Sequence, residues 1–390
     1  MNAAPTNLGG IPTLNKFLIG SGSWSFLGGK GFFLSGPAYD AGSNALTLFE
    51  VVFMETAGYI IVGAICERIT FWSFLLCELF IGAILYPVFG CWVWGGGWMS
   101  QLGSAVNLGH GYVDFAGSTV VHAVGGFCAL ALAMILGPRL GKYGPDGKPR
   151  AFPAHNIAFV VIGTFISLFG WMGFNPGSTL GATDLRISVI AVNTNLAAIA
   201  GSADAMLLWY FMFGKPDITM ACNGMLAGLV AITAPCAFVS PISATIIGVV
   251  AGVIVCFGVL FFERVAKVDD PCGAISVHGL CGWFGAVSGH LCRRNIRRRM
   301  ERCGRDKLSR PRGAGRDRIT LWGYPSIPGP ARRGDAVCGL GIRRDVRPMC
   351  PNLTWQLIRK RRPRRPRHEV RKLPYRKAGA QNEAKQGHTL

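Results

Sequence analysis

The first 288 residues carry little charge of either sign: they hold 11 Lys and Arg against 13 Asp and Glu, a formal balance of −2. Residues 289–390 hold the other 29 bases and 7 acids, a balance of +22, so the net charge of +20 belongs to the last quarter of the chain. The apolar residues before it lie in long runs and not in short amphipathic stripes. This pattern disfavours a water-soluble globular domain and predicts a polytopic helical membrane protein.

Spacings typical of metal sites, disulfide frameworks and hydrolases are missing as well. The 13 cysteines form no C-x-x-C pair, and several, such as Cys77, Cys128 and Cys256, stand in apolar runs, where we expect small buried side chains. No H-E-x-x-H sequence and no evident nucleophile–base pair occurs, so a membrane enzyme is disfavoured and we expect no cofactor. The N-terminal MNAAPTNLGGIPTLN lacks a basic segment followed by an apolar one, so we expect no secretory signal.

Apolar runs long enough to cross about 30 Å of hydrocarbon begin after residue 44. Seven complete runs lie at 45–66, 72–93, 115–136, 155–174, 187–213, 218–239 and 242–262. An eighth begins near Ala274 and stops after Ser288. Because open strands cannot pair their backbone groups in lipid, the runs predict helices, and the expected fold is an all-α membrane-spanning bundle.

The ends of the chain differ from this region in composition. Residues 1–43 are rich in glycine and hold only short apolar stretches, so we expect an extramembrane lead-in before a transmembrane domain at 44–288. Residues 289–390 are dense in Arg and Pro without helical or strand periodicity, which predicts a disordered tail or non-native sequence. Anionic lipid would suit such a tail, but its aromatics are too sparse to stack bases, so we expect no specific nucleic-acid partner.

Lysine and arginine are unevenly shared between alternate connections of the runs. One set of connections holds eight of them: Arg68, Arg139, Lys142, Lys148, Arg150, Lys215, Arg264 and Lys267. The other set, residues 94–114, 175–186 and 240–241, holds only Arg186. By the positive-inside rule, the first set is expected to face the cytoplasm and the second set the outside.

One pattern occurs twice in the apolar region. Asp114 and His122 stand eight residues apart in YVDFAGSTVVHAVG, and Asp270 and His278 repeat the spacing in VDDPCGAISVHGLCG. Asp114 opens the third run and Asp270 the eighth, so an odd number of crossings separates them and the two units enter the membrane from opposite sides. This is typical of an inverted-topology repeat, whose interface holds the transport path near the midplane.

The two residue types in this pattern suggest different roles. A single intramembrane histidine is explained by an interhelical hydrogen bond, but two at matching repeat positions favour a polar line through a narrow pore, since a neutral imidazole both donates and accepts. An aspartate near a helix N-terminus caps free N–H groups and meets the positive end of the helix dipole. For Asp114 a structural cap and a ligand role both stay open, whereas Asp270 is expected to be mainly a structural acid.

Aromatic residues gather in the segments that face the outside. Phe49 and Phe53 stand one helical turn apart, Trp94 lies in WVWGGGW, and Phe174 and Ser178 lie in GWMGFNPGS. Aromatic faces attract cations and a serine hydroxyl accepts from N–H donors, so these residues favour a cation site. An aromatic belt at the membrane interface is the alternative.

The motifs DFAGSTVVH, GWMGFNPGS, NTN at 193–195 and VDDPCGAISVHG resemble the ammonium transporter family (Amt/Mep/Rh), with a likeness from about Phe49 to Val287. The resemblance implies trimers of eleven-helix subunits in the plasma or inner membrane, each subunit with its own narrow pore. It also implies roles for residues of this chain: a substrate vestibule of Trp94, Phe49 and Ser178 with Asp114 as the acid below it, a gate of Phe53 and Phe174, and a pore lined by His122 and His278.

The chain departs from this family's pattern at both ends. About eight of the eleven helices are expected, because two are not visible upstream of Ala45, the tenth stops after Ser288 and the eleventh is absent. The family's cytoplasmic tail, which contacts nitrogen-regulatory PII proteins, has no counterpart, so that partner is expected only of a complete parent. Three functions stay open: a transporter that deprotonates ammonium and conducts it past two histidines, an ammonium sensor, and a non-functional fragment.

Overall fold

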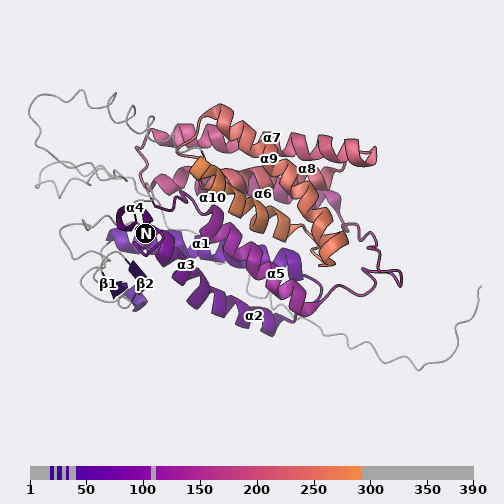
Figure 1. The fold of residues 1–390 in the computed structure, drawn as a ribbon, viewed down its shortest axis with the longest axis horizontal. Coiled ribbons are helices and arrows are strands. Elements are labelled where there is room, and N and C mark those ends of the chain that lie inside the picture. The colour runs from indigo at the N-terminus through magenta and orange to yellow at the C-terminus, as the bar shows by residue number, and fades with distance from the viewer. Residues whose placement is uncertain (1–17, 22–23, 29–31, 35–40, 107–110, 292–390) are drawn as a thin grey trace, which may run out of the picture. The chain divides into compact units, whose positions relative to one another are not determined.

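The computed structural model describes residues 18–21, 24–28, 32–34, 41–106 and 111–291, and most of this part is helical (Figure 1). Six helical stretches in it are long and apolar enough to cross a membrane: Asn44–Ile65, Phe71–Val93, Ser118–Leu136, Ile157–Thr179, Arg186–Phe213 and Pro241–Ala266. They confirm the all-α, membrane-spanning fold. The predictions for residues 292–390, and for most of 1–43, lie outside the described residues.

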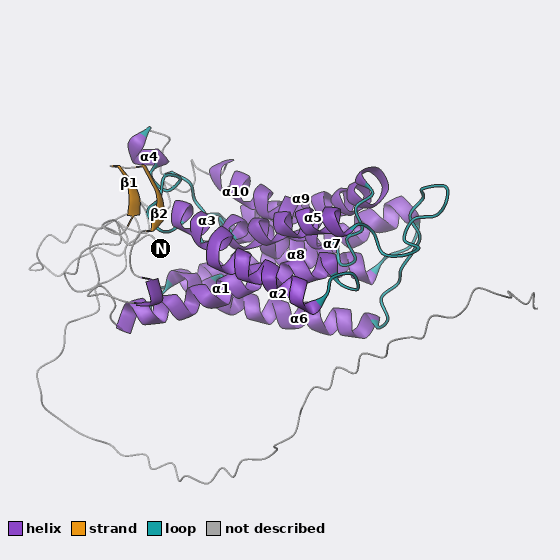
Figure 2. Cartoon of the chain, turned by 90° about the horizontal axis from the view of Figure 1, so that it is seen from below, coloured by secondary structure: helices purple, strands orange, loops and turns teal. Residues whose placement is uncertain are grey.

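Several spans are built from two or three helical segments in succession. The described elements are β1 (Leu18–Ser21), β2 (Trp24–Gly28), η3 (Phe32–Leu34), α1 (Ala41–Ile65), α2 (Phe71–Phe80), η4 (Ile81–Leu85), α3 (Tyr86–Val93), α4 (Leu102–Ala105), η5 (Ser118–Ala123), α5 (Val124–Leu136), α6 (Ile157–Phe174), η6 (Pro176–Thr179), α7 (Arg186–Phe213), α8 (Ile218–Thr233), α9 (Pro241–Leu260), η7 (Phe261–Ala266), η8 (Ile275–Leu280) and α10 (Cys281–Leu291). Strands β1 and β2 pair antiparallel, and Trp92 after them donates to the carbonyl of Phe26 over 2.9 Å. Figure 2 shows β1, β2 and α4 at one end of the helices and the long loop after α5 at the other.

Helices α7, α8 and α9 pack against one another at very short range (Figure 1). A methyl group built on Gly201 of α7 would lie 2.4 Å from the carbonyl oxygen of Gly224 on α8 and 3.1 Å from that of Gly248 on α9. Only glycine at this position lets the three backbones meet. Between helices in lipid, apolar burial gives little net attraction, so close packing of small residues supplies the stability.

Helix α8 is shorter than the predicted run 218–239, because it ends at Thr233. Pro235 has no N–H to continue the helix. The carbonyls of Thr233 and Ala234 instead accept from the backbone N–H groups of Ala116 and Phe115, at 3.1 Å each. Of the predicted run, residues 218–233 are helix and only residues 234–239 lie beyond it; the carbonyls at this helix end hold the segment that carries Asp114.

The two segments that carry the repeated acid–histidine pattern lie antiparallel. The start of η5 lies beside α10: a methyl group on Gly282 would be 2.4 Å from the carbonyl oxygen of Ser118. Farther along α5, a methyl group on Gly126 would be 2.2 Å from the backbone nitrogen of Gly279 in η8. The order of these contacts runs in opposite directions along the two segments, so the inverted arrangement predicted from the sequence is present.

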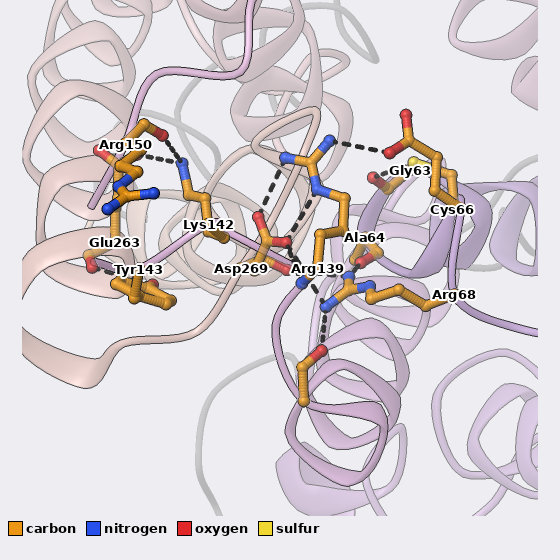
Figure 3. A network of polar contacts seen from close by, with 12 residues as sticks. Gly63, Ala64, Cys66, Arg68, Arg139, Lys142, Tyr143, Arg150, Glu263 and Asp269 are labelled. Atoms are coloured by element: carbon orange, nitrogen blue, oxygen red, sulfur yellow. Dashed lines mark hydrogen bonds and ion pairs between the residues drawn. The ribbon is translucent and has the colours of Figure 1, made fainter. Parts of the chain in front are cut away.

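A network of ion pairs ties three connections together at the far end of α5 (Figure 3). Asp269 accepts from the backbone and the guanidinium of Arg139 at 2.8–3.1 Å, and Arg68 donates to the backbone carbonyl of Asp269 over 2.9 Å. Lys142 bonds Glu263 over 2.5 Å. All these bases belong to the set of connections expected to face the cytoplasm. Since Asp269 is 1% exposed, its charge is compensated by arginine and not by water.

Acid should weaken this network. Burial by itself raises the pKa of Asp269, but the hydrogen bonds and the charges of Arg139 and Arg68 outweigh it and hold the pKa below its ordinary value. A carboxyl whose pKa is lower in the folded state stabilises the fold above its unfolded pKa of about 3.9, and this stability is lost as the pH falls through the folded value. We expect the unfolding temperature of the detergent-solubilised chain to fall as the pH drops below about 4.

Asp269→Asn should be less stable at pH 7 and should show a smaller further loss of stability in acid. Asp146→Asn, at a 59% exposed position, serves as the control, and an acid loss in Asp269→Asn equal to that of the parent chain would contradict the assignment.

Candidate functional site

The two histidines of the repeated pattern meet inside the bundle. The Nδ1 atoms of His122 and His278 lie 3.3 Å apart, and the ring centroids lie 5.3 Å apart. His122 is 1% exposed, and its Nε2 has no hydrogen-bond partner within the described part of the chain. The contact between Gly126, one turn after His122, and Gly279, directly after His278, allows the two helices to approach this closely.

Each histidine stands in a π-helical turn that begins after an aspartate and a left-handed glycine. Gly117, with φ of 105°, precedes η5, and Gly273, with φ of 74°, precedes η8. The wider turn shifts the side chains that follow it relative to an ordinary α-helix, and such turns are frequent at functional sites. The D-x-x-G sequences DFAG and DPCG carry this signal, which the expectations from the acid–histidine spacing did not use.

Asp114 caps the first of these turns with both carboxylate oxygens. One oxygen accepts from the backbone N–H groups of Gly117 and Ser118 at 2.9 and 2.8 Å, and the other from those of Thr119 and Val120 at 2.8 and 3.0 Å. The hydroxyl of Thr119 adds a fifth bond of 2.6 Å. In the structure Asp114 therefore acts as the cap of a helix N-terminus, where its negative charge meets the positive end of the helix dipole.

Asp270 caps the second turn in the same way but with fewer bonds. Its two oxygens accept from the backbone N–H groups of Ala274 and Ile275, at 3.0 and 2.8 Å. The mainly structural role expected for Asp270 from the sequence stays a prediction. The two aspartates thus occupy equivalent places at the opposite ends of the antiparallel pair.

Stacked aromatic rings cover the histidine pair on the side of Asp114. The rings of Phe53 and Phe174 lie 4.1 Å apart and within 7° of parallel. The Phe174 ring also lies 5.5 Å from that of His122, so it lies between Phe53 and the histidine. The ring of Phe49 lies 4.3 Å from that of Phe53, and the ring of Trp94 lies 6.0 Å from that of Phe53 at an angle of 68°.

Trp94 and Ser178 are held by hydrogen bonds to backbone carbonyls. The indole N–H of Trp94 donates to the carbonyl of Asp114 over 2.6 Å, which joins the aromatic layer to the capped turn. The hydroxyl of Ser178 donates to the carbonyl of Phe174 over 2.7 Å, so its lone pairs stay free to accept. Phe49 lies 3.9 Å from a methyl group built on Gly177, next to Ser178.

Trp171 is part of the site but did not emerge from the sequence patterns. Its ring stacks on His122 at 5.1 Å and 18°, and its indole N–H donates to Thr233 over 3.0 Å. It stands three residues before Phe174, on the same face of α6, and this spacing was the available signal. Among the described residues no group of three or more His, Cys, Asp or Glu could hold a metal ion.

The fold and the site together define a class of protein. A multi-pass helical membrane protein carries two antiparallel, similarly capped helices that bring one histidine each to a buried pair beneath stacked aromatic rings. This architecture suits passage of a small solute along the interface of the two repeats.

Comparison with known proteins assigns the family. A profile of the Ammonium Transporter Family matches residues 16–301, and the chain belongs to this family, whose members are transporters and not enzymes. Ammonium transporter Amt2 of Archaeoglobus fulgidus is 52% identical over 273 residues, which cover 70% of this chain and 58% of the relative. The Ammonium transporter of Bacillus subtilis is 35% identical over 274 residues, with 70% and 64% covered.

Solved structures agree with this assignment. A structure titled Sensor Amt Protein matches with a TM-score of 0.64 and 37% identity, covering 70% of this chain and 68% of that one. Mep2 of Saccharomyces cerevisiae matches with a TM-score of 0.56 and 33% identity, covering 63% and 52%. The chain spans 58% of the length of the Archaeoglobus relative and 64% of the Bacillus one.

Proposed function

We propose that the chain conducts ammonium across a cell membrane by taking up the cation at the aromatic layer and passing a neutral amine along the histidine pair. The observation that carries the proposal is the pair itself: two buried imidazoles 3.3 Å apart, directly beneath the stacked rings of Phe53 and Phe174, in a member of the ammonium transporter family.

The aromatic layer is suited to hold the cation before it enters. The ring faces of Phe49 and Trp94, which both lie against Phe53, attract a cation, and the free lone pairs of Ser178 can accept one N–H of ammonium. Desolvated cation–π contacts contribute about 2 kcal/mol. Asp114 acts here through the backbone it caps and through its negative charge, since both oxygens already accept hydrogen bonds.

Dehydration of the ion is the physical reason for proton loss. A bare cation in an apolar passage costs far more than a small neutral amine, so ammonium gives its proton to water on the outer side of the rings and passes them as ammonia. Phe53 is 3% exposed and stacked on Phe174, so the two rings close the passage and must rotate for each solute molecule. Rotation on this scale is a side-chain motion and not a rearrangement of helices.

The histidine pair offers a neutral amine one donor and one acceptor. A hydrogen bond between the two Nδ1 atoms needs one protonated and one bare nitrogen. In two neutral imidazoles, the donor ring then has a bare Nε2 and the acceptor ring has an Nε2–H. A molecule of ammonia can accept from one Nε2 and donate to the other. These two hydrogen bonds replace hydrogen bonds that ammonia made with water.

Trp94 provides the test of the outer site. In liposomes that contain the chain, a step in external ammonium should raise the pH inside the vesicle, because the neutral amine takes up a proton there. Trp94→Leu should raise the ammonium concentration at half-maximal flux by about tenfold, the equivalent of losing about 1.4 kcal/mol of cation binding. Trp72→Leu changes a 72% exposed tryptophan on α2 and should leave this concentration unchanged. An equal shift in both variants would reject the site.

The same vesicles separate transport from sensing. The solved relative titled Sensor Amt Protein makes an ammonium sensor the second candidate function. A sensor binds ammonium, so calorimetry would detect heat of binding while the vesicles show no flux. A non-functional fragment would show neither.

We further propose assembly as a homotrimer, as the family resemblance implies, and the molecular mass of the detergent-solubilised chain measures it.

A further inference from the structure

Two cysteines that are not part of the histidine site lie beside the ion-pair network. Cys66 directly follows α1, and Cys272 lies in the connection before η8, three residues after Asp269. A methyl group built on Gly63 would lie 3.4 Å from the Cβ and 3.9 Å from the Sγ of Cys272. The Cys66 thiol lies 3.7 Å from the carbonyl oxygen of Gly63 and within hydrogen-bond reach of the Cys272 thiol. Neither thiol is fully buried, and Cys272 is exposed.

The charges around the pair favour a reactive thiolate at Cys66. Arg68 and Arg139 lie close to it, and Figure 3 shows the three residues together. The hydrogen bond from Cys272 is the largest cause that lowers the pKa of Cys66 below its ordinary value, and the two arginines add to it, whereas partial burial and Glu67 oppose it. The same hydrogen bond, with burial and the charge of Asp270, raises the pKa of Cys272, which therefore keeps its proton. One thiolate and one neutral thiol in contact are the arrangement of a redox-active dithiol.

We propose that Cys66 and Cys272 form a redox site that closes to a disulfide on reaction with a low-molecular-weight disulfide such as oxidised glutathione. The Cys66 thiolate attacks one sulfur of the disulfide RSSR, forms a mixed disulfide and releases RS⁻. Cys272 then loses its proton and attacks the Cys66 sulfur, which releases the second RS⁻. The two cysteines lose two electrons, RSSR gains them, and two molecules of RSH leave after taking up two protons.

The disulfide would join the two halves of the inverted arrangement. Cys66 belongs to the end of α1, which packs against α5, and Cys272 belongs to the segment that leads through the Asp270 cap into η8 and His278. Closing it would fix the start of η8 to the end of α1. This site is separate from the proposed conduction of ammonium, and its chemistry is measured without a transport assay.

The first test is formation of the bond. The full chain in detergent micelles is equilibrated with mixtures of reduced and oxidised glutathione, trapped with acid and digested, and the peptides that contain Cys66 and Cys272 are followed by mass spectrometry. A cross-linked pair is expected to form and to disappear on addition of dithiothreitol. Cys77 and Cys128 are the internal control, since they lie close to each other inside the spans, beside Glu78 and not beside arginine. A cross-link between Cys77 and Cys128 at the same glutathione ratio, or none between Cys66 and Cys272, would overturn the proposal.

The second test is the reactivity of Cys66 in variants that cannot form the bond. Cys272→Ser keeps a hydrogen-bond donor beside Cys66, whereas Cys272→Ala removes it. The pH midpoint for alkylation of Cys66 should lie about one pH unit lower in Cys272→Ser than in Cys272→Ala. Both variants should retain the mixed disulfide of Cys66 with glutathione and lose the cross-link. Equal midpoints in the two variants would show that Cys272 does not act on Cys66 and would also overturn the proposal.

Discussion

Replacing His122 by alanine is expected to lower the ammonium flux of the reconstituted chain by about tenfold. The alanine removes one of the two hydrogen-bond partners offered to ammonia inside the apolar passage, and a hydrogen bond contributes about 1–1.5 kcal/mol. A loss of about 1.4 kcal/mol in the transition state lowers the rate tenfold. Leucine at both His122 and His278 fills a comparable volume without any polar atom, so the flux should fall by about a hundredfold.

The control for this prediction is another histidine of the same chain. His155 is exposed in the loop between α5 and α6, and His155→Ala should leave the flux unchanged. Because His122 packs on Trp171, each variant must also elute from size-exclusion chromatography at the position of the parent chain. A correctly assembled His122→Ala variant with undiminished flux would refute the histidine role and leave the family assignment intact.

Replacing Asp114 by alanine is expected to cause the largest loss of stability of any single substitution considered. Four backbone N–H groups and the Thr119 hydroxyl lose their acceptor at a position that is 3% exposed. A single buried donor left unsatisfied costs about 1–3 kcal/mol, so the total should exceed about 4 kcal/mol even though the losses do not add fully. We expect little or no folded protein in mild detergent. Asp114→Asn keeps one acceptor oxygen and should give an intermediate yield.

The control for this cap is the aspartate that caps α8. Asp217 accepts from the backbone N–H and the hydroxyl of Thr219, at 2.8 and 2.7 Å, near the end of the span where water is accessible. Asp217→Ala should cost about 1 kcal/mol, the usual value for a helix cap. The yield of folded protein after size-exclusion chromatography measures both. Equal losses of folded protein in the Asp114 and Asp217 variants would show that the hydrogen bonds to Asp114 are not what stabilises the turn.

Most of the helical architecture could be predicted from the sequence because lipid leaves few alternatives. A run of about 20 apolar residues must pair its own backbone groups, and six of the seven complete runs are spanning helices close to the expected bounds. The run at 218–239 was the exception. Its composition is mostly apolar, but Pro235 lacks an N–H, and the carbonyls of Thr233 and Ala234 at the helix end accept from residues 116 and 115. A partner more than a hundred positions away decided where that helix ends.

The site was only partly visible in the sequence. The repeated spacing of Asp114 and His122 with Asp270 and His278 indicated two equivalent units, because similar local motifs produce similar local turns. Trp171 was not found, since its role depends on which face of α6 meets His122. The contact of Cys66 with Cys272 was equally hidden, because the two residues come from different connections and share no motif.

The sequence by itself determined the class of this protein and the positions of most of its spans, because hydropathy and local caps act over a few residues. The tertiary structure alone decided that the two imidazoles meet at 3.3 Å, that both oxygens of Asp114 already accept hydrogen bonds, and that the rings of Phe53 and Phe174 stack 4.1 Å apart. These features depend on how closely the antiparallel helices approach. That distance is set by Gly126 against Gly279, a contact between residues 153 positions apart in the chain.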